Sequence, residues 1–215
     1  AQLLISPSGA DEQRFQGATP ASMPPRFLAV GRFVAKKGPM DTLEAFARMQ
    51  GLTEQADACS LVMVGVGPLL PFVKERARQL GLEQMVQFPG VLPPEAVAQE
   101  MRRARVFVQH SRTAEDGDEE GCPVSVMEAQ LCGLPVVATR HGGIPDVVVD
   151  QQTGRLVEEG DRLAMAEAMA LLVDRPDLAA AWGAAGHRRA QAQFTVAHHV
   201  DQITMLLNGL VGCRR

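Results

Sequence analysis

The chain has 215 residues, of which 46% are hydrophobic, and its formal net charge is −4. This size allows one large domain or two small ones, with a core that needs neither disulfides nor metals to hold it together. The acidic balance argues against a nucleic-acid partner, because proteins that bind nucleic acids are usually basic.

The first 24 residues combine Gly, Pro and Ser with little periodicity, and we expect them to form an irregular lead-in or linker. Short apolar runs then alternate with helical patterns. The expected strands are residues 27–31, 60–65, 86–88, 106–110, 135–139 and 155–157. The expected helices are residues 39–50, 69–80, 93–103, 124–132, 162–173, 177–193 and 196–210. This alternation predicts an α/β fold, a Rossmann-like doubly wound parallel sheet with helices on both faces.

Ligands of such sheets bind at the C-terminal ends of the strands. Two cations, Arg32 and Lys37, follow the first expected strand and therefore lie on that rim. A guanidinium can bind phosphate oxygens bidentately, and a lysine adds a point charge. Taken alone, both cations are better explained as ordinary surface charges. Lys36 competes with Lys37 for the role, although we expect Lys36 to be solvated.

Two carboxylates, Glu120 and Glu128, flank the loop and start of the helix at residues 124–132. A helix start offers free backbone N–H groups and a positive dipole end, which suits a phosphate. Ionised carboxylates accept hydrogen bonds from hydroxyl groups. Glu128 lies in an otherwise apolar helix, where a carboxylate is costly unless it has a ligand or a structural partner. Phosphate together with vicinal diols indicates a nucleotide sugar.

Three further features are weaker. The segment V-G-V-G-P, after the second expected strand, lacks the third glycine and the acidic ribose partner of a dinucleotide fingerprint. Asp116 and Asp118 form a D-x-D pattern that could hold a divalent ion, but acidic surface loops are commoner. His141 precedes two glycines on a rim loop, where it either contacts substrate or simply adds polarity.

The order of these motifs resembles a known family. V-G-R-x-x-x-K-K-G, V-G-x-G-P, E-x7-E, A-x-x-C-G-L-P-V-V-A-T and G-G-I-P follow one another as in the C-terminal, donor-binding domain of retaining GT-B glycosyltransferases of family 4, the glycosyl transferases group 1. The motifs cover residues 25–160. The opening S-P-S-G-A-D-E-Q-R-F also resembles that family's interdomain segment.

The resemblance implies retaining, metal-independent glycosyl transfer from a nucleotide-diphosphate sugar, a UDP- or GDP-sugar, without a cofactor. Arg32 and Lys37 match the cations on the donor diphosphate, and Glu120 matches the carboxylate at the donor sugar; these three are the expected catalytic residues. Glu128 matches the ribose-binding carboxylate. The remaining expected donor contacts are Gly121 and Val124 at the helix start and Phe88 at the base-binding edge.

Two departures from the family pattern stand out. The chain has E-G-C-P where the family commonly has E-G-F-G, and Pro123 lacks an N–H that could contact phosphate. E-G-x-P also occurs in the family, often in polysaccharide assembly. The N-terminal acceptor domain has no counterpart here. We therefore expect a linker at residues 1–24, a donor-binding domain at 25–195 and a C-terminal helix at 196–215, inactive without the missing half.

Alternative functions stay open at this point. A GT-B-related nucleotide-sugar epimerase would share the architecture. A nucleotide-binding module without catalysis would share the site, and a GT-A enzyme would use Asp116 and Asp118 for a metal. A hexosyltransferase in bacterial polysaccharide biosynthesis is the preferred interpretation.

Cellular location is indicated by cysteine usage and hydropathy. The chain has four cysteines, widely spaced and without a C-x-x-C pair, which favours reduced thiols in the cytoplasm and no zinc or redox motif. No apolar run is long enough to cross a membrane, and no signal peptide is visible. We expect any peripheral membrane contact to be made through the missing half.

Overall fold

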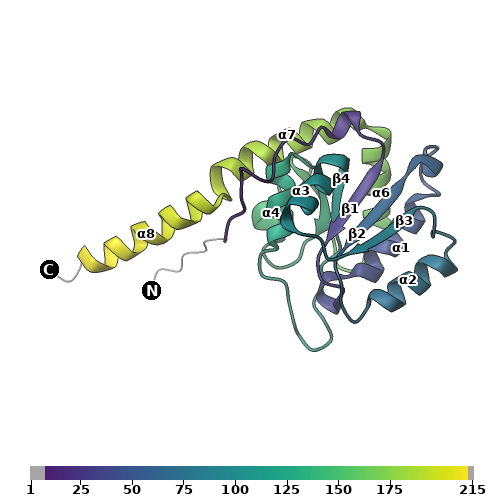
Figure 1. Ribbon diagram of the computed structural model, residues 1–215, viewed down its shortest axis with the longest axis horizontal. Coiled ribbons are helices and arrows are strands. Elements are labelled where there is room, and N and C mark those ends of the chain that lie inside the picture. The colour runs from purple at the N-terminus through teal and green to yellow at the C-terminus, as the bar shows by residue number, and fades with distance from the viewer. Residues whose placement is uncertain (1–7, 213–215) are drawn as a thin grey trace.

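The computed structural model describes residues 8–212, in which a six-stranded parallel sheet carries helices on both faces (Figure 1). The strands are β1 (Arg26–Val30), β2 (Ser60–Val64), β3 (Val86–Gly90), β4 (Val106–Gln109), β5 (Val136–Thr139) and β6 (Gly154–Val157). Their order across the sheet is β3-β2-β1-β4-β5-β6. The predicted Rossmann-like sheet is confirmed, and β3 continues to Gly90, two residues beyond its predicted end.

The helices are α1 (Pro39–Met49), α2 (Leu70–Gln79), α3 (Pro94–Arg103), α4 (Val124–Cys132), α5 (Ile144–Val147), α6 (Arg162–Asp174), α7 (Pro176–Gln193) and α8 (Val196–Gly212). The short helix α5 is absent from the sequence prediction, because four residues are too few to show a helical period. Within residues 8–212, none of the helices combines the length and apolar character needed to cross a bilayer.

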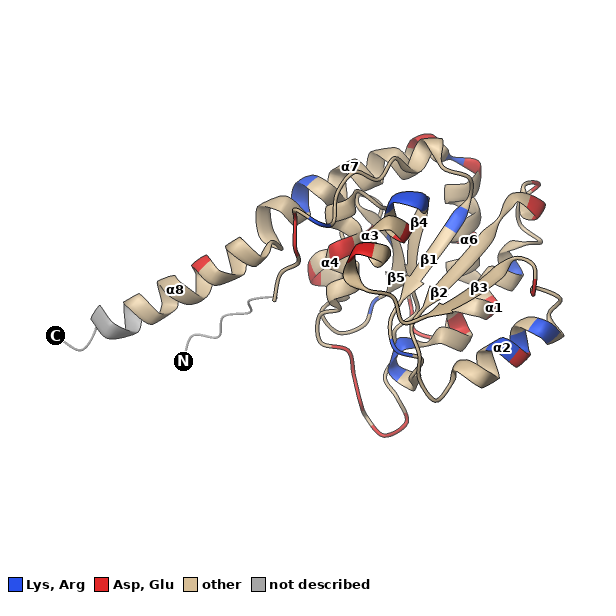
Figure 2. Cartoon of the chain, viewed as in Figure 1, with Lys and Arg blue, Asp and Glu red and all other residues tan. Residues whose placement is uncertain are grey.

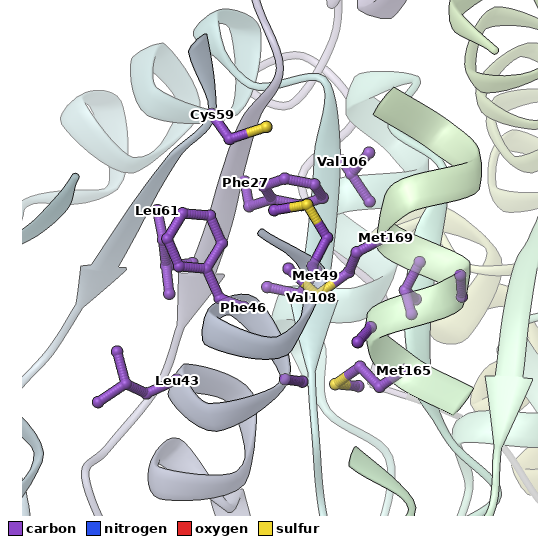
Figure 3. Packing of buried hydrophobic residues seen from close by; sticks show 14 of the residues in the cluster. Phe27, Leu43, Phe46, Met49, Cys59, Leu61, Val106, Val108, Met165 and Met169 are labelled. Atoms are coloured by element: carbon purple, nitrogen blue, oxygen red, sulfur yellow. The ribbon is translucent and has the colours of Figure 1, made fainter. Parts of the chain in front are cut away.

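Each face of the sheet has its own apolar core. Helices α1, α2 and α6 cover one face, and α3, α4 and α5 cover the other. Figure 3 shows Phe27 of β1 beside Phe46 of α1, with Met169 of α6 in the same cluster. The two rings meet edge to face, with centroids 5.9 Å apart. Full burial of such side chains contributes about 1.5–3 kcal/mol each, so these contacts fix α1 firmly against β1.

The described part of the lead-in, residues 8–24, contains a short 3₁₀ helix, η1 (Pro20–Ser22), and packs against the domain. Phe15 is only 2% exposed, and the Ala18 amide donates to the carbonyl of Cys132 at the end of α4. Residues 1–7 of the expected linker and 213–215 of the expected terminal helix lie outside the described residues. Figure 1 shows α8 extending away from the sheet and its helices.

The strand order places a topological switch point between β1 and β4. From β1 the chain adds β2 and β3 on one side, whereas from β4 it adds β5 and β6 on the other. The loops that leave β1 and β4 therefore diverge and leave a crevice between them, which is where doubly wound sheets bind ligands. Arg32 and Lys37 follow β1, and Glu120 lies on the loop after β4.

Candidate active site

Arg32 and Lys37 lie in the turn after β1. A short 3₁₀ helix, η2 (Ala35–Lys37), ends this turn and leads into α1. The Lys37 stem folds back over Gly31, where an added Cβ would lie 3.5 Å from Lys37 Cδ. The Arg32 side chain is exposed and forms no ion pair with any of residues 8–212. With Gln109 of β4 the two cations line a small cavity of about 30 Å³ at the switch point.

Lys37 and Glu120 form an ion pair across the switch point. Lys37 Nζ lies 2.6 Å from Glu120 Oε2, and the two side chains are 16% and 14% exposed. Glu120 Oε2 is buried and has no hydrogen-bond partner among the described residues, so the contact is electrostatic without hydrogen-bond geometry. The structure thus brings together two of the predicted catalytic residues. Each side chain neutralises the other, which offsets part of the cost of burying two charges.

Lys36 is not solvated, and that expectation was wrong. Its Nζ lies 2.8 Å from Asp118 Oδ1 and donates to the Glu119 carbonyl, and its side chain is 16% exposed. Consecutive residues of a 3₁₀ helix point roughly 120° apart, so Lys36 and Lys37 reach different partners. Lys36 therefore holds the acidic loop, residues 113–120. Figure 2 shows the acidic residues of this loop in red along the connection between β4 and α4.

The two aspartates of the D-x-D pattern serve the acidic loop itself. Asp118 pairs with Lys36, and Asp116 Oδ1 accepts a hydrogen bond from the Asp118 amide at 3.1 Å. No group of three or more metal-capable side chains occurs within residues 8–212. The structure therefore does not assemble these aspartates into a ligand set.

Glu128 lies one turn into α4, on the same face as the exposed Val124 at the helix start. Burial raises the pKa of the Glu128 carboxyl to about 7, and nearby Arg14 opposes this shift. No hydrogen bond or ion pair joins this carboxylate to the described part of the chain. Gly121, just before the helix, is also exposed. A carboxylate left partly buried without a protein partner is suited to a ligand that brings hydroxyl donors.

Phe88 lies on β3, at the other end of the rim. Its ring is 6.3 Å from that of Phe33, the residue after Arg32, and Lys74 Nζ lies 5.8 Å from its centroid. The ring is partly buried in this aromatic and cationic setting. Phe88 is thus connected through Phe33 to the turn that also carries Arg32 and Lys37.

His141 contacts the predicted site in a way that the sequence pattern did not reveal. Its Nε2 accepts a hydrogen bond from the Glu120 amide at 2.9 Å, and its Nδ1 lies 2.5 Å from Glu159 Oε1. The side chain is only 2% exposed. Gln109 was missed as well: its side chain joins Ser111 to Ser125 in the first turn of α4. No sequence spacing identifies His141 or Gln109 as a site residue, because only the fold brings each of them to its partners.

Replacement of Gly142 by Ala should distort the Glu120 loop. Gly142 has φ +49°, and an added Cβ would lie 1.8 Å from the Glu120 carbonyl oxygen. Left-handed strain costs roughly 1–2 kcal/mol and overpacking adds about 1–3 kcal/mol, so we expect a loss of about 3 kcal/mol in urea denaturation. Gly81→Ala is the control, since Gly81 has φ +70° and nothing within 4 Å. Equal losses in the two variants would show that the Glu120 contact is unimportant.

Comparison with known proteins identifies relatives of the chain. The family of glycosyl transferases group 1 matches residues 10–189. The putative colanic acid biosynthesis glycosyltransferase WcaL of Escherichia coli K12 is 36% identical over 172 residues, which are 79% of this chain and 41% of WcaL. A GDP-mannose-dependent α-(1-6)-phosphatidylinositol monomannoside mannosyltransferase of Mycolicibacterium smegmatis is 32% identical, over 86% of this chain and 48% of that protein.

The fold comparison agrees. A sucrose-phosphate synthase from Thermosynechococcus elongatus superposes with a TM-score of 0.82 at 27% identity, covering 96% of this chain and 52% of that one. The chain therefore corresponds to a Rossmann-like half of a GT-B fold, and it spans about half the length of these three proteins or less.

Proposed function

The chain belongs to the glycosyl transferases group 1, and from this membership we propose that it is the donor-binding half of a GT-B glycosyltransferase that uses a nucleotide-diphosphate sugar. The observation that carries the proposal is the convergence of Arg32, Lys37 and Glu120 at the switch point between β1 and β4. Two cations suit a diphosphate, and a carboxylate beside them suits sugar hydroxyls.

Each part of the donor has a candidate partner. Arg32 and Lys37 bind the diphosphate, together with the α4 start at Gly121 and Val124. Glu128, whose pKa burial raises and which has no partner among the described residues, accepts hydrogen bonds from the ribose hydroxyls. Phe88, near Phe33 and Lys74, forms the edge toward the base. Glu120 meets the hydroxyls of the transferred sugar.

The reaction is retaining transfer of a hexosyl group. The bond between the anomeric carbon and the phosphate oxygen breaks, and its electron pair leaves with the nucleoside diphosphate. The acceptor hydroxyl oxygen forms a new bond to the anomeric carbon on the same face, and its proton passes to the leaving phosphate oxygen. Arg32, Lys37 and the helix start stabilise the charge on that leaving group, which is electrostatic preorganisation without a metal ion. The acceptor molecule, bound by the other half of the enzyme, supplies the hydroxyl.

The setting that we propose is cytoplasmic polysaccharide biosynthesis. The WcaL relative, named for colanic acid biosynthesis, supports this class of product. The mannosyltransferase relative, named for its dependence on GDP-mannose, makes GDP one of the nucleotides to test.

Calorimetric titration with UDP, GDP and ADP tests the proposal directly. We expect one diphosphate to bind equally with and without EDTA, and Arg32→Ala to weaken it by about 10- to 100-fold, the effect of losing hydrogen bonds to a charged group. Arg78→Ala is the matched control, because Arg78 is exposed on α2 and pairs with Glu75 away from the site. Binding lost with EDTA, or an Arg32→Ala variant that binds like the wild type, would contradict the proposal.

A further inference from the structure

We propose that His141 and Glu159 position the Glu120 carboxylate by holding both ends of the acidic loop, residues 113–120. This inference rests on the proposed function, because it concerns the carboxylate assigned to the donor sugar. His141 and Glu159 are positioning residues in this account and touch no reacting atom.

The contacts form a continuous chain. The amide of Thr113, at the start of the acidic loop, donates to Glu159 Oε2 at 2.8 Å. The amide of Glu120, at its end, donates to His141 Nε2 at 2.9 Å. The 2.5 Å contact between His141 Nδ1 and Glu159 Oε1 joins the two. One side-chain pair therefore fixes the first and last residues of the loop.

The hydrogen bonds define the tautomer of His141. Nε2 must accept from the Glu120 amide, so the ring proton lies on Nδ1 and is donated to Glu159. The ring is 2% exposed, so water cannot readily replace it as the acceptor. Removal of the acceptor would leave a donor of the Glu120 backbone unsatisfied in a largely buried place.

Glu120 depends on this support because its side chain has little other. Its Oε2 has no hydrogen-bond partner in the described structure, and its contact with Lys37 is an ion pair without hydrogen-bond geometry. The Gly143 amide donates a hydrogen bond to the Gly121 carbonyl. This bond holds Gly121, the residue after Glu120, against the turn at 141–143. The turn at 141–143 thus sets where the backbone of Glu120 lies, and with it the position of the carboxylate.

The test compares His141→Phe with His141→Gln. Phe fills the volume but accepts no hydrogen bond, whereas Gln places an oxygen near the position of Nε2. Binding of UDP, UDP-glucose, GDP and GDP-mannose is measured by calorimetry, and the sugar increment is the affinity ratio of sugar nucleotide to diphosphate. We expect His141→Phe to lower this ratio about tenfold with diphosphate affinity retained, and His141→Gln to restore part of it.

Glu158→Gln is the control, since Glu158 neighbours Glu159 but its side chain is 76% exposed. Nitrogen NMR adds an independent readout: wild-type His141 should carry its proton on Nδ1, and the Glu120 amide should exchange faster in His141→Phe. A ratio unchanged in His141→Phe but lowered by Glu120→Gln would overturn the positioning role alone. Failure of the wild type to bind any of the four probes would overturn the proposed function, and the inference with it.

Discussion

Glu128→Gln is expected to stabilise the fold and to weaken nucleotide binding. Burial holds the pKa of the Glu128 carboxyl at about 7, against 4.5 for an ordinary glutamate. Each pKa unit corresponds to about 1.4 kcal/mol, so the charged form costs up to about 3 kcal/mol, and solvent that reaches the carboxylate reduces this to about 1–3 kcal/mol. The amide has no such cost.

The pH dependence follows from the direction of the shift. Below pH 4.5 the carboxyl is protonated in both folded and unfolded chains, and Glu128 costs nothing. As the pH rises from 4.5 through 7 the unfolded chain releases its proton first, so the free energy of unfolding falls; above 7 the loss is complete. The gain from Glu128→Gln should therefore be absent at pH 4 and full at pH 8.

Urea denaturation at pH 4 and pH 8 measures this gain, and titration with the preferred nucleoside diphosphate measures the loss of affinity. We expect about 10- to 100-fold weaker binding, because hydrogen bonds to a charged acceptor are lost. Glu167→Gln, an exposed carboxylate on α6, should change neither quantity. A variant that binds less tightly but gains no stability at pH 8 would mean that the buried carboxylate is satisfied within the protein.

The strands and the rim of the sheet could be predicted because their signals are local. All six strands begin and end within two residues of the expected positions, since apolar runs such as Phe27–Val30 and Leu61–Val64 lie between turn residues. Chain order alone then places Arg32 and Lys37 on the same edge as Glu120, because parallel strands end at one edge.

The partners of these residues could not be predicted from spacing. Lys36 and Lys37 are adjacent in sequence, and only the geometry of η2 decides that one reaches Asp118 and the other Glu120. His141 lies 21 positions from Glu120, and the contact depends on how the turn after β5 folds against the acidic loop. Such long-range side-chain contacts leave no periodic trace in the sequence.

Substitutions in the Lys37–Glu120 pair are also expected to have large effects. Removing the lysine and removing the carboxylate should change diphosphate binding in opposite directions. Lys37→Ala leaves a largely buried carboxylate unpaired, and we expect a loss of stability of about 2–4 kcal/mol and roughly 100-fold weaker diphosphate binding. Lys36→Ala, in the same turn, should loosen the acidic loop but retain most of the diphosphate affinity.

Glu120→Gln removes the competing anion and frees Lys37, whose flexible stem can move its charge toward solvent or ligand. We expect near-neutral stability and tighter binding of the nucleoside diphosphate, by about tenfold, together with loss of the sugar increment, since the carboxylate no longer meets the sugar hydroxyls. The double variant Lys37→Ala, Glu120→Gln should recover stability but not binding, and the cycle gives the coupling energy. If Glu120→Gln weakens diphosphate binding as much as Lys37→Ala does, Glu120 does not compete with the diphosphate for Lys37, and the ion pair persists in the bound state.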